Sequence, residues 1–428
     1  MISIIKRLTL RPAVSLIGAI LFFLSPDAKA GEVEFGFSTS LSERYEDNID
    51  LEEEDLEDED YITSFTPNLS LSYVTPSTDF HLIYNPAIEF YAKNSDENEV
   101  RQNGNLDLNS QLTPRLRLTA TDVLSFTPGQ DIAGEEEFEE RGRRSRSYAS
   151  DRLSNVFNTT LSYQILQCTS LRGGVSHSFD NYDRSEQSDS YEYGFDFGFD
   201  HQLTGKDTLF GKYRYRVMRY DKSEENDTDV QSVTVGETHQ FPRALLLTIS
   251  GGVSWVDEDN EDRETDWNCH VSLRKDFRTG SLNLSFDREF SASSGDGDTT
   301  VINTYNVTGI KELSRHLTGT LSAFFAAEES ASGDEVDTED WGMNLGSTYQ
   351  FSRKLSGTLS CSFVRQNSMV QGEGDTDNYR GRVNIDYLLL PNWSVFSSYS
   401  YYQQNARDPI EDDIENNVFE FGLRVTWF

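Results

Sequence analysis

The chain contains little cysteine, little proline and too little apolar sequence to build a bundle of membrane helices. Its 428 residues include 3 Cys and 10 Pro, and 36% are hydrophobic, with a mean hydropathy of −0.59. Three widely spaced cysteines, Cys168, Cys269 and Cys361, exclude a disulfide framework and a C-x-x-C metal site. The low hydrophobic content excludes a transmembrane helix bundle.

An excess of basic residues is also missing. The chain has 37 Lys and Arg against 73 Asp and Glu, which gives a formal net charge of −36. Such a chain repels phosphate backbones, so we expect no nucleic-acid partner. Aromatic residues are plentiful, however: 27 Phe, 20 Tyr and 5 Trp make up 12% of the chain. A disordered acidic chain does not carry so many aromatics, and the composition therefore indicates a folded protein.

The first thirty residues have the pattern of a secretory signal peptide. A basic start with Lys6, Arg7 and Arg11 precedes an apolar run from Ala13 to Leu24, and the small-residue site Ala28-Lys29-Ala30 follows. We therefore expect residues 1–30 to be a signal peptide and residues 31–428 to form one domain. The apolar run is too short to span the ~30 Å core of a bilayer.

Apolar and polar residues alternate with a period of two throughout the rest of the chain. Tyr191, Tyr193, Phe195, Phe197 and Phe199 are separated by Glu192, Gly194, Asp196 and Gly198, which gives one aromatic face and one polar face. This period predicts β-strands rather than helices. Similar runs occur at Leu69, Leu71 and Tyr73, at Tyr213, Tyr215 and Val217, at Leu282, Leu284 and Phe286, at Val383, Ile385 and Tyr387, and at Phe419, Phe421, Leu423, Val425 and Trp427.

The connections between these strands alternate in length. Nine short links, such as Thr204–Lys206, alternate with ten longer and mostly acidic links, such as Asp221–Asp229. This pattern predicts a single antiparallel transmembrane β-barrel of about 20 strands, or 18 if one hairpin is merged, with short periplasmic turns and long acidic extracellular loops. Lipid offers no partners to backbone amides, so a spanning sheet must close on itself. A soluble β-sandwich or propeller would leave the asymmetry of the links unexplained.

Two short segments resemble known outer-membrane proteins. The chain ends on Trp427 and Phe428, after an alternating strand, which is similar to the closing strand that the barrel-assembly machinery recognises. Near the predicted mature start, Tyr45, Asp47, Asn48 and Ile49 precede an acidic segment and Pro67-Asn68-Leu69-Ser70-Leu71. This resembles the opening of the β-barrel porin 2 family. The resemblance implies exopolysaccharide export and, as a further partner, a periplasmic polysaccharide-export component.

Alternation also predicts which charged side chains line the pore. On two neighbouring strands it directs opposite charges to the same face, where they can pair. The candidate pore-lining residues are Glu192, Asp196, Asp200, Lys212, Arg214, Arg216, Arg380, Arg382 and Arg424. Mixed signs favour a water-filled conduit for neutral or mixed polymers over a strong anion filter. The alternative is that these pairs only stabilise the wall.

Two long links contain unusual charge patterns. The third long link, Thr127–Ser147, is a candidate constriction loop because acids precede bases within it: Glu135, Glu136, Glu137, Arg141, Arg143, Arg144 and Arg146. The alternative is that these charges are solvated at the barrel mouth. The segment from Glu46 to Asp60 contains eleven acids but no D-x-D-x-D-G calcium pattern, so we expect a solvated loop that shares divalent cations with lipopolysaccharide. We predict no resident metal or cofactor.

Catalytic motifs are missing. The pair His177-Ser178 cannot act as base and nucleophile, because neighbours on a strand point to opposite faces. The sequence therefore predicts no enzyme but a porin-like conduit in the outer membrane of a Gram-negative bacterium, in contact with lipid and lipopolysaccharide. Polysaccharide export is the expected function. A general diffusion porin for small solutes is the alternative, and a barrel-borne hydrolase comes third.

Overall fold

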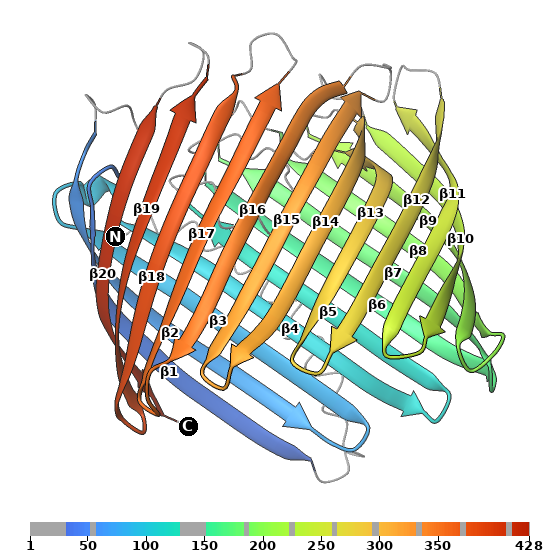
Figure 1. The fold of residues 1–428 in the computed structure, drawn as a ribbon, viewed down its shortest axis with the longest axis horizontal. Coiled ribbons are helices and arrows are strands. Elements are labelled where there is room, and N and C mark those ends of the chain that lie inside the picture. The colour runs from blue at the N-terminus through green and yellow to red at the C-terminus, as the bar shows by residue number, and fades with distance from the viewer. Residues whose placement is uncertain are drawn as a thin grey trace.

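The computed structural model describes residues 31–51, 57–128, 151–183, 188–221, 227–258, 263–292, 299–330, 336–368, 374–407 and 413–427. These residues form twenty β-strands and one short 3-10 turn, η1 (Ser95–Glu97), and no helix among them is long and apolar enough to cross a membrane. The strands are labelled in Figure 1. Their bounds are β1 Glu32–Glu46, β2 Asp60–Val74, β3 Thr78–Tyr91, β4 Glu99–Thr113, β5 Leu116–Thr127, β6 Arg152–Leu166, β7 Thr169–Tyr182, β8 Ser190–Gln202, β9 Asp207–Tyr220, β10 Thr228–Phe241, β11 Leu245–Glu258, β12 Glu264–Phe277, β13 Gly280–Ala292, β14 Thr299–Ser314, β15 Leu317–Ser330, β16 Val336–Gln350, β17 Leu355–Ser368, β18 Thr376–Leu390, β19 Trp393–Ala406 and β20 Ile414–Thr426.

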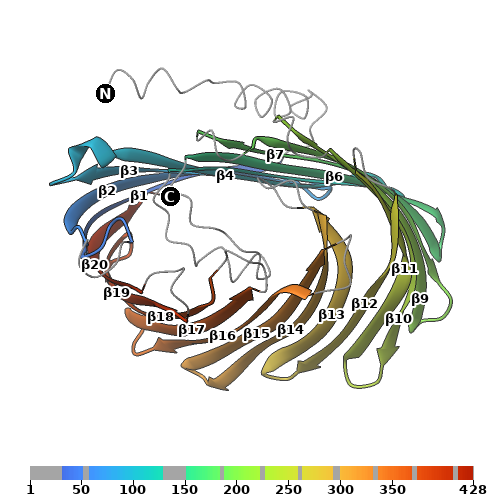
Figure 2. The same cartoon turned by 90° about the horizontal axis from the view of Figure 1, so that it is seen from above.

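The strands form one closed antiparallel sheet. Each strand pairs with its neighbours in chain order, and β1 pairs with both β2 and β20. Figure 2 shows the resulting ring, with β1 to β7 along one long side and β14 to β18 along the other. Closure removes the free sheet edges, so every strand has backbone partners on both sides. The predicted class and the count of 20 strands are confirmed.

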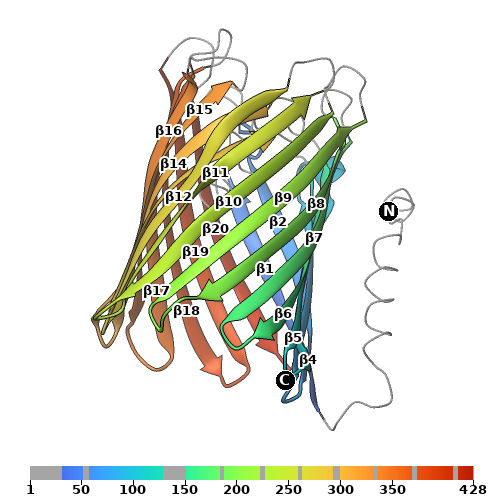
Figure 3. The ribbon, with the colours of Figure 1, turned by 90° about the vertical axis from the view of Figure 1, so that its right-hand side faces the viewer.

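The two rims differ as the sequence predicts. At one rim the chain turns within a few residues, as from Thr113 in β4 to Leu116 in β5, and β1 begins and β20 ends there. At the other rim the links are longer, as from Tyr182 in β7 to Ser190 in β8. Figure 3 shows the tight hairpins at the bottom of the barrel. By analogy with outer-membrane barrels, the two rims are called periplasmic and extracellular below.

Contacts between distant strands identify the inner face of the sheet. Arg214 in β9 lies 3.9 Å from Glu289 in β13, and its neighbour Arg216 donates a hydrogen bond of 3.2 Å to the Phe290 carbonyl. Three strands separate β9 from β13 in the sheet, so these contacts can only cross the interior. Registered partners share a face, and the assignment therefore extends from strand to strand around the barrel.

The outer face is apolar and aromatic. On β8 the residues that alternate with the inner face are Tyr193, Phe195, Phe197 and Phe199, and all four are exposed. Large exposed side chains also face outward on the other half of the barrel, for example Phe421 on β20. A sheet with a polar inside and an apolar outside is the reverse of a soluble β-protein, and it suits a lipid surrounding.

Candidate functional site

The inner wall of β7, β8 and β9 carries a cluster of opposite charges. Asp196 on β8 accepts contacts from Lys212 Nζ at 2.9 Å and from Arg214 Nε at 3.3 Å. One pair further along the wall, Arg172 Nη2 lies 2.7 Å from Asp200 Oδ1. The side chains of Asp196, Lys212 and Arg214 are 34 to 40% exposed, so water reaches the cluster from the lumen. The sequence prediction that these two strands direct opposite charges to one face agrees with this geometry.

Small residues on β8 make room for the long cations of β9. Gly194 is registered with Arg216, and Gly198 is registered with Lys212. A Cβ at Gly194 would overlap Ser176 Oγ of β7. Because glycine has no side chain, the inner face of β8 has free space at these two positions. The long side chains of β9 can therefore extend to Asp196 and, across the lumen, to β13.

A second group of inward cations lies on β18 and β20. The Arg380 guanidinium lies 5.5 Å from the Tyr402 ring centroid, and that of Arg424 lies 5.1 Å from the Phe396 ring centroid. Arg382 Nε donates to Asn384 Oδ1 at 3.3 Å. Aromatic rings and an amide therefore contribute to holding these cations in place.

The extracellular ends of β13 and β14 lean into the barrel. Phe290 packs in a buried cluster with Val230 of β10, Val256 of β11 and Val301 of β14, and its side chain is 4% exposed. To reach β10 and β11, Phe290 must pass over the inner face of β12. In Figure 2 the upper part of β13 lies inside the curve made by β11 and β12. This hairpin narrows the lumen beside the charge cluster of β9.

The inward lean interrupts the sheet between β12 and β13. Their pairing runs only from Phe277 and Gly280 to Cys269 and Arg288, and Glu264–Asn268 of β12 have no partner on β13. Arg288 bridges the gap: it lies 2.6 Å from Asp266 and 3.4 Å from Glu329, and its guanidinium stacks 4.8 Å from the Trp267 ring centroid. The wall is therefore held by side chains where backbone pairing ends.

The residues that carry the family resemblance tie the barrel together at the extracellular rim. Asn417 donates through its backbone N–H and its side chain to the two carboxylate oxygens of Asp47, at 2.6 and 2.9 Å. Asn48 donates to the Glu415 carbonyl at 3.0 Å and is fully buried. These bonds join the end of β1 to β20, next to the seam that closes the sheet. Sequence reasoning had given Asp47 and Asn48 no role.

A buried carboxylate organises the link between β3 and β4. Asp60, at the start of β2, accepts backbone hydrogen bonds from Ala92, Lys93 and Asn94 at 2.9 to 3.0 Å, and it is fully buried. Next to it, the Lys93 ammonium holds the pKa of the exposed Glu59 carboxyl below its usual range. Part of the acidic segment therefore has defined contacts, where the sequence predicted a solvated loop.

Some predicted residues lie outside the described part of the chain. These are the signal peptide at residues 1–30, Phe428, and the whole candidate constriction set: Glu135, Glu136, Glu137, Arg141, Arg143, Arg144 and Arg146. Trp427 is described: its ring stacks on the Phe37 ring with the centroids 5.1 Å apart, and its backbone N–H donates to the Phe37 carbonyl at 2.8 Å. The last described residue thus pairs with β1 at the seam.

The cysteines and the pair His177-Ser178, which the sequence analysis considered for chemistry, do not come together. Cys168, Cys269 and Cys361 are unpaired. His177 is registered with Tyr193 on the outer face, and Ser178 is registered with Glu192 on the inner face. The two side chains therefore point to opposite sides of the wall, as the alternation predicts.

Comparison with known proteins shows the fold alone. No family model and no curated protein matches the chain. Among solved structures, a mutant of the ferric enterobactin receptor PfeA from Pseudomonas aeruginosa matches with a TM-score of 0.56 at 10% identity, over 94% of this chain and 81% of that one. The siderophore receptor PirA from Pseudomonas aeruginosa matches with a TM-score of 0.53 at 10% identity, over 94% and 81% of the two chains. The FrpB iron transporter from Neisseria meningitidis gives 0.53 at 9% identity, over 92% and 81%. The chain therefore has the fold of large β-barrels of this kind, and its likeness to the β-barrel porin 2 family stays a resemblance.

Proposed function

We propose that this protein is a passive conduit through the outer membrane and that its cargo is an exported polysaccharide. The observation that carries the conduit is the reversed polarity of the closed 20-strand sheet, with ion pairs inside and aromatic side chains outside. Barrels of 16 to 18 strands already enclose an aqueous channel unless a plug fills it. Solved structures with the same fold include a siderophore receptor and an iron transporter, which supports an outer-membrane transport role.

The chemistry of one inner wall supports a carbohydrate cargo. On β17, β18 and β19, amides and hydroxyls contact each other in a continuous ladder. The Tyr402 hydroxyl oxygen lies 3.0 Å from Asn378 Oδ1 and 3.1 Å from Gln404 Oε1 and donates its one proton to either of them, and Asn378 Nδ2 donates to Gln366 Oε1 at 3.3 Å. A sugar hydroxyl is both a donor and an acceptor. It can therefore take the place of one amide or hydroxyl partner in this ladder at a time. The aromatic rings of Tyr402 and Phe396 add flat apolar surfaces to the same wall.

The proposal includes the partners that the resemblance implies. The outer wall contacts lipid and lipopolysaccharide, the barrel-assembly machinery inserts the chain through its last strand, and a periplasmic polysaccharide-export component delivers the polymer to the short-turn rim. No catalytic step is assigned to the protein.

Deletion of the gene tests the cargo. We expect a surface polysaccharide to be lost or to accumulate in the periplasm, and the wild-type gene to restore it. Unchanged polymer together with slower uptake of a small solute would overturn polysaccharide export and would favour the alternative, a general diffusion porin. A double variant Tyr402→Ala with Asn378→Ala sharpens the test: it should reduce export while the level of folded barrel stays the same.

A further inference from the structure

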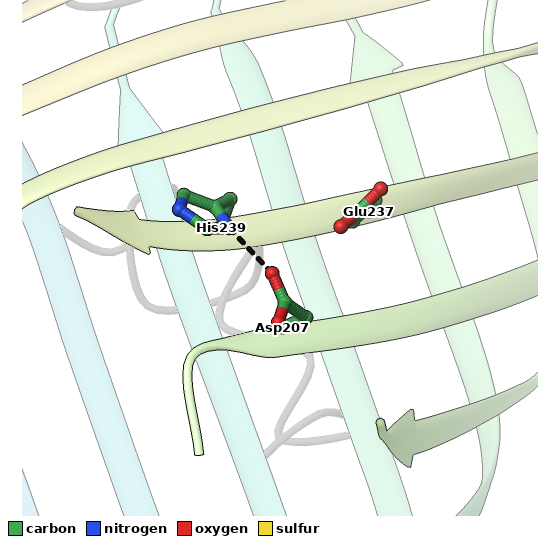
Figure 4. Close-up of side chains that lie close together, drawn as sticks. All are labelled: Asp207, Glu237 and His239. Atoms are coloured by element: carbon green, nitrogen blue, oxygen red, sulfur yellow. Dashed lines mark hydrogen bonds and ion pairs between the residues drawn. The ribbon is translucent and has the colours of Figure 1, made fainter. Parts of the chain in front are cut away.

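Three side chains of the kinds that bind metals meet on the outer wall at the periplasmic rim. Asp207 begins β9, and Glu237 and His239 lie near the end of β10. The two strands pair antiparallel with Asp207 opposite His239, which brings residues 32 positions apart in the chain into contact. Figure 4 shows Asp207 and His239 pointing toward one another across the strand pair, with Glu237 beside them.

All three side chains are on the outer face. Their strand positions alternate with Arg214 on β9 and with Ser232 on β10, which lie on the inner face. Glu237 and His239 line a groove of about 690 Å³ on this wall, together with Phe199, Leu209, Val235 and Ile249. Val235 is 62% exposed, and its registered neighbours on both sides are Gly211 and Gly251, so the apolar surface is open around it.

The geometry is suited to a divalent transition metal. One ligand atom from each of Asp207, Glu237 and His239 lies within 4.8 Å of the others. Imidazole and carboxylate are ligands that Zn²⁺ accepts, and three protein ligands leave at least one position for a further donor. Asp207 Oδ1 already bonds His239 Nδ1, and a cation would replace the proton that joins them.

Neighbouring groups fix two of the three ligands. Thr204 Oγ1 donates to Asp207 Oδ2, so the carboxylate has its second oxygen occupied and its first directed to His239. The His239 ring packs edge-on against Phe241, with ring centroids 4.2 Å apart. Hydrogen bonds and packing around ligands of this kind hold them in place and raise metal affinity.

The position of Glu237 gives the physical reason to expect a cation. Glu237 lies four residues before Phe241, the last residue of β10. For a strand that rises ~3.3 Å per residue and tilts ~45°, this is about 9 Å from the end of the strand along the barrel axis, on the face that is directed to lipid. A lone carboxylate facing lipid is unfavourable. Among the residues that the structure describes, the Glu237 side chain has no hydrogen bond or ion pair. A dication would neutralise Glu237 and Asp207 together, with neutral His239 as the third ligand.

We propose that Asp207, Glu237 and His239 form a binding site for a divalent transition metal, with Zn²⁺ as the probe, on the outer wall of the barrel. The site is on the outer face, away from the lumen. The metal-site proposal can therefore be tested independently of the proposed conduit function.

Zinc titration of the full mature protein tests the site. The protein is prepared without a polyhistidine tag and is washed with chelator in detergent. It is then titrated against a chromophoric zinc chelator in excess Mg²⁺, which competes with Zn²⁺ for exposed carboxylates elsewhere on the protein. We expect one Zn²⁺ per barrel. Glu237→Gln and His239→Gln should each weaken binding by about tenfold or more, and Thr204→Val, which only frees Asp207, should weaken it by about tenfold. His201→Gln is the matched control, because His201 lies on β8 at the same rim and bonds Thr169 instead.

Two results would overturn the assignment. One is equal zinc affinity in the wild type and in the Glu237→Gln and His239→Gln variants, with each barrel shown to be folded by heat-modifiable migration. The other requires no variant: Co²⁺ added to the wild-type protein should give visible ligand-field bands of a low-coordinate site that Zn²⁺ abolishes, and a spectrum of hydrated Co²⁺ alone would contradict the proposal.

Discussion

Replacing Lys212, Arg214 and Arg216 together by Gln should shift the barrel toward cation selectivity. In the wild type this stretch of inner wall holds four cations and four carboxylates, namely Arg172, Lys212, Arg214 and Arg216 against Glu192, Asp196, Asp200 and Glu289. The substitutions leave one cation and all four carboxylates. Asp196 keeps access to water, since its side chain is 34% exposed.

Coulomb's law gives the size of the effect. A unit charge about 8 Å from a passing ion contributes ~0.5 kcal/mol in a water-like dielectric, so three charges contribute ~1.5 kcal/mol. Salt at ~0.1 M reduces this by roughly half, because the Debye length is about 10 Å. The remaining ~0.7 kcal/mol enriches cations about threefold at this wall and depletes anions by about the same factor. The ratio of cation to anion permeability should therefore rise by up to about tenfold.

Reversal potentials in a salt gradient across a planar bilayer measure this ratio. Glu192→Gln with Asp196→Asn and Asp200→Asn should move the potential in the opposite direction. Arg365→Gln is the control, because Arg365 is paired with Asp377 on the outer face. If neither triple variant moves the potential, or if both move it the same way, ions do not pass this wall and the reasoning is refuted.

Other parts of the barrel give further expectations. Phe290→Ala should raise single-channel conductance, because the side chain holds the inward hairpin against β10 and β11, and an unchanged conductance would show that this hairpin does not narrow the path. Asp60→Ala removes the acceptor of several backbone N–H groups, and the lost hydrogen bonds stabilise this link by on the order of 3 kcal/mol. Trypsin should therefore cut after Lys93 about a hundredfold faster, and equal rates would show that Asp60 does not hold this link. Trp427→Ala with Phe428→Ala should lower the yield of heat-modifiable, inserted barrel more than either single change, and normal insertion of the double variant would remove the last strand as the assembly signal.

Much of the fold could be predicted because lipid imposes a strict rule on each strand. The residues of a strand that face lipid must be apolar, and the residues between them point into the lumen. A period of two therefore identifies both the strand and the direction of its side chains. The Asp196, Lys212 and Arg214 cluster follows directly, since it needs only two adjacent strands in a register that a tight turn fixes.

The structure departs from the prediction where distant strands meet. Phe290 continues the outward phase of Leu284 and Phe286, so alternation places it on the lipid side. It is buried instead, because β13 leaves β12 beyond Arg288 and its end lies inside the barrel, where the outward side of β13 faces the inner wall of β10 and β11. No local pattern in the sequence encodes the end of that pairing. Asp207 and His239 were missed for a similar reason: neither lies in a recognisable ligand motif, and only the register of β9 with β10 brings them together.

Conductance of the purified barrel in a planar bilayer tests the central claim most directly. An open 20-strand barrel with a charged inner wall should give discrete ohmic channels whose current reverses symmetrically with voltage. Protein that is shown to be inserted and folded, yet carries no current with the third long link either intact or deleted, would contradict the conduit.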